Sequence, residues 1–186
     1  GTLTVDQNVN LNDAADAYNT IEKSLIGITN NAVISGSLAN QVAIADNFSS
    51  VNSVTYNNMI NNGTVSLTGD GSVAIYANNG NITNSSAVSA TGKESFGIYG
   101  ENGTVSTNTG TITIGDQGVG IYGVSYQDPS NPGANGGGLI NITNSGSITG
   151  TGGSGTIGIY SNTNRTGGTK GDAVVTLSGG TINLGN

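Results

Sequence analysis

The segment Phe96-Gly97-Ile98-Tyr99 carries the pattern that decides the fold, because closely related tetrapeptides recur along the chain. Tyr99 lies 23 residues from both Tyr76 and Tyr122, and Tyr160 follows 38 residues later. The copies are Val73-Ala74-Ile75-Tyr76, Val119-Gly120-Ile121-Tyr122 and Ile157-Gly158-Ile159-Tyr160, preceded by Val42-Ala43-Ile44-Ala45, which lacks the aromatic residue. A period of this length indicates a repeat architecture.

Two further patterns repeat along the chain with a base period near 23 residues. One is a short Thr-rich strand, with central apolar residues Leu3, Ile34, Val65, Val88, Ile112, Ile148 and Ile182. The other lies six or seven residues earlier and is centred on Ile28, Met59, Ile82, Val105, Ile142 and Val175. Asn often follows this second centre by two residues, as in Asn30, Asn61, Asn84 and Asn144. Alternation of apolar and polar residues predicts strands with one buried and one solvated face.

Three short strands in each repeat of about 23 residues predict an all-β fold, a right-handed parallel β-helix (β-solenoid), for residues 28–186. A single coil cannot bury its inward residues, but neighbouring coils about 4.8 Å above and below it can. Each buried Val or Ile then contributes roughly 1.5–3 kcal/mol. The repeated Asn suits a bend between strands, and we expect these side chains to form a ladder in adjacent coils.

Residues 1–27 fit the period poorly. Helix-forming residues run from Asp13 to Lys23 after a candidate cap at Asn12 or Asp13. This segment is therefore expected to be either an irregular first coil or a short N-terminal helix packed on the stack.

The composition excludes several classes of site. A net charge of −7 with four basic residues leaves no cationic footprint for nucleic acid. The absence of His and Cys excludes Ser-His-Asp and Cys-His arrangements and ordinary zinc sites. Asp70 and Asp116 each precede a motif Tyr by six residues but lie two repeats apart, so turn residues are a better interpretation than an acid–base pair. We expect no catalytic residue, metal or cofactor.

The insertions that lengthen some repeats fall at one corner of the coil. They occupy residues 46–57, 124–138 and 162–172, each after an Ile-Tyr-type strand. In repeat proteins, insertions at one corner often form the binding face. The candidate binding residues in these loops are Tyr126, Asp128, Asn131, Arg165, Lys170 and Asp172. The alternative is that the loops are tolerated surface insertions without a ligand.

Two columns of outward side chains are further candidates. Tyr76, Tyr99, Tyr122 and Tyr160 stack outward if the flanking Ile residues point inward, and such a row either braces the coils or binds sugars or protein. Inward tyrosines remain open at this point. A hydroxyl array, Thr64/Ser66, Thr111/Thr113 and Ser147/Thr149, resembles the threonine ladders of ice-binding β-solenoids, although Val33, Ala87 and Asn183 interrupt it.

The Gly-Ile-Tyr-Gly units at 97–100 and 120–123 and the strings Asn108–Ile112 and Asn144–Ile148 resemble autotransporter (type V secretion) passenger domains. The likeness is greatest to RadD-like fusobacterial outer-membrane adhesins and covers residues 28–186. It implies a non-enzymatic adhesin or stalk segment at the cell surface, attached to the outer membrane through a translocator barrel outside this sequence. Its expected partners are host or bacterial cell-surface proteins or glycans, without direct membrane insertion of this segment.

Two other functions fit the same architecture. The first alternative is an ice-binding β-solenoid that uses the outward Thr and Ser residues, and the second is a polysaccharide-active β-helix enzyme. Both ends of the stack are also expected to expose sheet edges that favour end-to-end or edge self-association.

Overall fold

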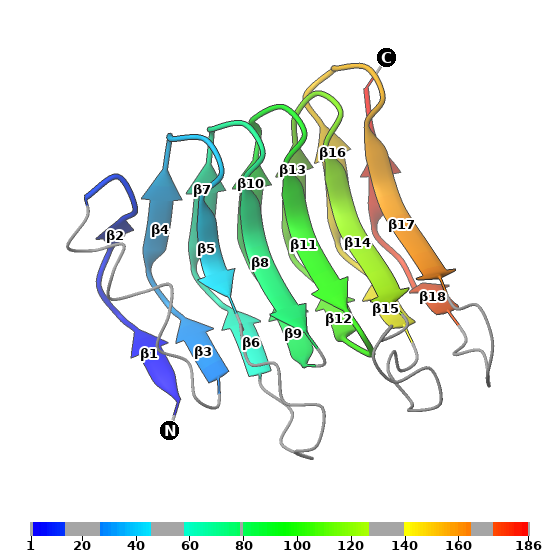
Figure 1. The fold of residues 1–186 in the computed structure, drawn as a ribbon, viewed down its shortest axis with the longest axis horizontal. Coiled ribbons are helices and arrows are strands. Elements are labelled where there is room, and N and C mark those ends of the chain that lie inside the picture. The colour runs from blue at the N-terminus through cyan, green and yellow to red at the C-terminus, as the bar shows by residue number, and fades with distance from the viewer. Residues whose placement is uncertain are drawn as a thin grey trace.

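The computed structural model describes residues 2–13, 27–45, 58–78, 80–126, 140–164 and 173–185, and these ranges form three parallel β-sheets without any helix (Figure 1). Sheet A comprises β1 (Leu3–Val5), β3 (Gly27–Asn30), β6 (Asn58–Asn61), β9 (Asn81–Asn84), β12 (Val105–Asn108), β15 (Ile140–Asn144) and β18 (Ala173–Leu177). Sheet B comprises β2 (Val9–Asn10), β4 (Val33–Gly36), β7 (Thr64–Leu67), β10 (Ala87–Ala90), β13 (Thr111–Ile114), β16 (Ser147–Gly150) and β19 (Thr181–Asn183). Sheet C comprises β5 (Val42–Ala45), β8 (Val73–Asn78), β11 (Phe96–Glu101), β14 (Val119–Tyr126) and β17 (Ile157–Asn164).

The chain passes from sheet A to sheet B and, in five coils, on to sheet C before it returns to sheet A one level higher (Figure 1). Each strand pairs in parallel with the equivalent strand of the next coil, as in the register Ile98↔Ile121. This is the parallel β-helix that the repeat predicts. The described ranges contain no helix long and apolar enough to cross a membrane.

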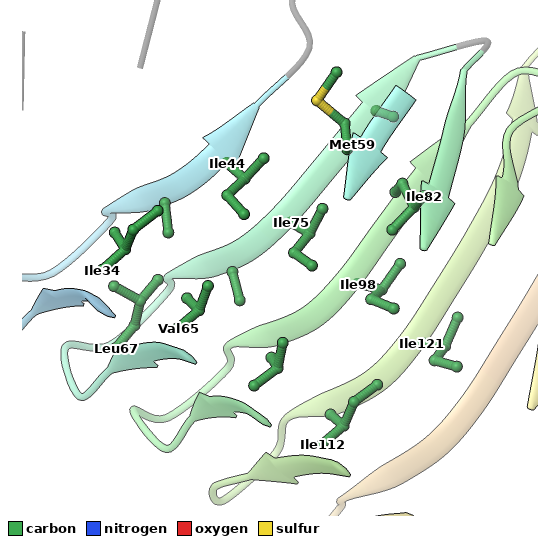
Figure 2. Close-up of a cluster of buried hydrophobic side chains, with 14 of the residues drawn as sticks. Ile34, Ile44, Met59, Val65, Leu67, Ile75, Ile82, Ile98, Ile112 and Ile121 are labelled. Atoms are coloured by element: carbon green, nitrogen blue, oxygen red, sulfur yellow. The ribbon is translucent and has the colours of Figure 1, made fainter. Parts of the chain in front are cut away.

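The core consists of apolar columns that run through the stack. Sheet A contributes the column that contains Ile28 and Ile82, sheet B the column that contains Ile34 and Ile112, and sheet C the column that contains Ile44 and Ile98. All of these side chains are fully buried, and Figure 2 shows them pointing into the space between the sheets. Because each Ile lies directly above another, one coil supplies the floor that the next coil needs.

Small residues let sheet C approach sheet B closely. In sheet C, Ala43, Ala74, Gly97, Gly120 and Gly158 precede the inward Ile. A Cβ on Gly120 would lie 2.7 Å from Ile148 Cγ2 and 2.5 Å from the Gly158 carbonyl oxygen. The Gly of the Gly-Ile-Tyr motif is therefore required by packing, because a methyl group has no room there.

A ladder of buried asparagine side chains lies at the end of sheet A. Nδ2 of each Asn donates to Oδ1 of the Asn in the next coil, at 2.8 Å from Asn30 to Asn61 and 2.7 Å from Asn108 to Asn144. The intermediate bonds, through Asn84, are also 2.8 Å long. Most of these amides donate in addition to a backbone carbonyl two residues later, as Asn84 does to Ser86. The ladder therefore holds the bend after each sheet A strand and links the coils, as the sequence predicted.

Two strand alignments made from the sequence are wrong. Leu3 pairs with Ile28 in sheet A rather than with Ile34, whose partner is Val9 in sheet B. A Leu between two Thr residues fits either strand type, and the first repeat offers no Ile-Tyr motif to fix its phase. In β12 the residue aligned with Ile82 is Ser106, because the preceding turn is one residue longer.

Val105 consequently lies on the outer face and is 36% exposed, while Ser106 occupies the inward column. The same shift places Asn108 in the asparagine ladder, which the sequence analysis had not recognised. The expected helix from Asp13 to Lys23 lies outside the described residues, apart from Asp13.

Replacing Asn84 by Ala tests the asparagine ladder. The substitution leaves the buried Asn61 amide without its acceptor and Asn108 Oδ1 without its donor. Since each unsatisfied buried group costs about 1–3 kcal/mol, the free energy of unfolding should fall by about 3 kcal/mol in urea titration. Asn81→Ala, at an outward position of the same strand, is the control and should change it by less than about 0.5 kcal/mol. Equal effects of the two substitutions would contradict a stabilising ladder.

Candidate ligand-binding face

The outer face of sheet C carries a row of aromatic side chains. Tyr76, Tyr99, Tyr122 and Tyr160 occupy one register position in four successive coils. Their ring centroids are separated by 5.6, 4.7 and 5.0 Å along the row. The Ile preceding each of the first three Tyr residues is fully buried, so the rings lie on the outside, where they are half-buried or exposed.

A second apolar column lies beside the tyrosines. It consists of Val42, Val73, Phe96, Val119 and Ile157. The ring of Phe96 packs edge-on against Tyr99 at 5.1 Å and against Tyr122 at 5.4 Å. The sequence analysis did not include Phe96 in the candidate site, although its position three residues before Tyr99 placed it on the same face. Sheet C therefore presents two adjacent apolar columns.

The ring geometry limits what this aromatic row can bind. Tyr122 and Tyr160 stack with an interplanar angle of 5°, so each covers a face of the other. Tyr99 and Tyr122 are tilted by 40° and still in contact. Ring edges and hydroxyls rather than open ring faces are left toward solvent. Tyr160, at the end of the row, is 36% exposed and has one ring neighbour among the described residues.

Polar groups adjoin both ends of the row. The Tyr76 hydroxyl donates to Glu101 Oε2 at 2.9 Å, which ties one coil to the corner of the next. Asn162 Nδ2 donates to the Tyr160 hydroxyl oxygen at 3.3 Å. These contacts fix ring positions, and they leave sheet C with one carboxylate, Glu101, among its described strands.

The corner that carries the insertions is built on a longer strand pair. β14 and β17 are eight residues long, whereas β8 and β11 have six. Their pairing continues to Tyr126↔Asn164, so the residues from which the second and third insertions start are partners in the sheet. Of the six candidate loop residues, only Tyr126 lies in a described strand. Asp128, Asn131, Arg165, Lys170 and Asp172 lie outside the described residues.

The hydroxyl array is more regular on sheet A than on sheet B. One outward column of sheet A holds six threonines, interrupted only by Ile60: Thr4, Thr29, Thr83, Thr107, Thr143 and Thr176. The sheet B array predicted from the sequence is present, with Val33, Ala87 and Asn183 in the expected interrupting positions. The Asn-Ile-Thr-Asn strings at 81–84 and 141–144 contained the signal for the sheet A column, because their Thr alternates with buried residues.

Charged side chains of the described coils gather at the turns between sheets B and C. Asp70 Oδ1 accepts the backbone N–H of Lys93 at 2.8 Å, and Asp116 Oδ1 accepts that of Ser154 at 2.6 Å. Both carboxylates thus hold the turn of the next coil. Within the described ranges, no three acidic residues come close enough to hold a metal ion.

No protein-family model, curated protein or solved structure matches this chain.

Truncating Tyr122 measures how much the aromatic row stabilises the stack. Tyr122 contacts three other rings, and aromatic pairs contribute about 0.5–1.5 kcal/mol each, so Tyr122→Leu should lower the free energy of unfolding by about 2 kcal/mol. Tyr160→Leu removes one ring pair and should cost about 1 kcal/mol. Urea titration followed by circular dichroism gives both values. A Tyr122 variant as stable as the wild type would show that the row does not brace the coils.

Proposed function

We propose that this chain is a non-enzymatic segment of a bacterial surface adhesin or stalk, of the autotransporter passenger kind, that mediates or displays attachment. The observation that carries the proposal is the in-register stack, which repeats each outward side chain from coil to coil along a straight-sided scaffold. Attachment to cell-surface proteins or glycans relies on many modest contacts that act together, and a repeated face provides them.

The insertion corner is the proposed contact region. Its strands, β14 and β17, extend together beyond the length of the other sheet C strands and end beside each other. Loops that begin at adjacent strand ends have a shared rigid base, which is the arrangement in which loops on a scaffold form binding sites. The aromatic row on sheet C ends next to this corner and would extend the contact area.

A loop-grafting experiment tests this assignment. Residues 125–140 and 163–173 are each replaced by Asn-Gly-Thr, the turn with which residues 102–104 cross the same corner between β11 and β12. The register between the flanking strands is preserved, so the fold should be retained. Binding to cultured epithelial cells and to a glycan array should fall at least tenfold.

The control variant shortens the other insertion at this corner. Residues 46–57 are replaced by Ala-Asn-Asn-Gly, the residues at 77–80 that join β8 to β9. This variant keeps all six candidate residues and should bind normally. Unchanged binding by a folded double graft would remove the insertion corner from the proposal.

The threonine column of sheet A supports ice binding as a second candidate function. Six threonines at the spacing of adjacent strands, about 4.8 Å, present methyl and hydroxyl groups in one straight row. If ice is the ligand, the protein shows thermal hysteresis that Thr107→Tyr on sheet A abolishes and Thr113→Tyr on sheet B leaves in place. Absence of thermal hysteresis in the wild type would exclude this function. A polysaccharide-active enzyme remains the third candidate.

A further inference from the structure

The two ends of the stack differ in how well their inward side chains are covered. In the last described coil, Val175 and Ile182 are 42% exposed and Leu177 is 59% exposed, although they continue inward columns that are buried elsewhere. These residues account for much of the exposed apolar surface in the described ranges. Residues 173–185 contain no charged side chain. This end therefore combines an uncovered core with the unpaired edges of β18 and β19.

The first coil presents the opposite condition. Val5 occupies the same column as Leu177 but is only 8% exposed, and Leu11 is only 4% exposed. The inward residues of this coil are thus covered on the side that faces away from the stack. Each molecule has one open end and one closed end.

We propose that the open end binds the open end of a second copy of this chain, so that assembly stops at a dimer. The interface continues the one that already joins the coils: apolar side chains stack in columns while strand edges pair. A closed first coil offers no matching edge, so head-to-tail growth into fibres does not occur. One self-complementary end per molecule gives a two-fold symmetric contact.

The shape of the open end fits this symmetry. Sheets A and B reach β18 and β19, whereas sheet C ends one strand earlier, at β17. A two-fold axis through sheet A sets β18 against its symmetry mate and places the projecting β19 of each copy over the recessed β17 of the other. Strands meet in antiparallel pairs, which the edge hydrogen-bonding groups accept as readily as parallel ones. This inference does not rest on the proposed adhesin function.

Light scattering on the purified chain, residues 1–186, tests the proposal first. At micromolar concentrations the mass should be twice the 18.4 kDa of one chain. The double variant Leu177→Lys/Ile182→Lys should be monomeric because it places charges in the interface. Val33→Lys/Leu38→Lys, which changes two other exposed apolar residues by the same charge, should remain dimeric. A monomeric wild type, or a dimer that survives the first double variant, would overturn the proposal.

Cysteine cross-linking then tests the orientation, and the absence of native Cys makes the readout clean. Thr176→Cys, in the last strand of sheet A, should cross-link to itself with a short bis-maleimide. Thr4→Cys, in the same outward column at the closed end, should not. A mixture of the two variants should give only Thr176–Thr176 products. Cross-links between positions 4 and 176, or ladders of larger species, would show head-to-tail stacking and contradict the closed dimer.

Discussion

The structure depends on one constraint: equivalent residues of successive coils must lie directly over one another. That register buries the Ile columns, aligns the backbone ladders of three sheets and brings each buried Asn within hydrogen-bonding distance of the next. A shift of one residue would turn every inward side chain outward, which is why the register is strongly specified. The chain has few charges to spend on other interactions, and the described part of the chain has one ion pair, between Lys93 and Glu94.

The same constraint shapes the outer surface. A residue that points outward in one coil is repeated in the next, so the exterior consists of columns of like side chains. Sheet A shows threonines, sheet C shows tyrosines beside branched apolar residues, and the carboxylates Asp70 and Asp116 recur at the turns between sheets B and C. Any ligand of these faces meets a repeated pattern rather than a recessed pocket of unique groups. That is a property suited to attachment, and the proposed functions follow from it.

Much of the fold could be predicted because the Ile-Tyr tetrapeptide marks the phase of each repeat. Where that marker is absent, in the first coil, Leu3 was placed in the wrong sheet. Where a polar residue takes an inward position, at Ser106, the apolar pattern pointed to the neighbouring Val105 instead. The tyrosine row could be located from spacing alone, but the stacking of its rings, and hence the loss of open ring faces, required side-chain geometry. Five of the six loop candidates lie outside the described residues, so their assignment stays a prediction.

An engineered disulfide between successive coils tests the in-register stack most directly. Thr83 and Thr107 are paired outward residues of β9 and β12, and adjacent paired strands lie about 4.8 Å apart, within the range that a disulfide spans. Thr83→Cys/Thr107→Cys should oxidise to an intramolecular disulfide in the native state, whereas Thr83→Cys/Thr143→Cys, two coils apart, should not. Failure of the first pair to oxidise while the protein is folded, or oxidation of the second pair instead, would contradict the stacked coil.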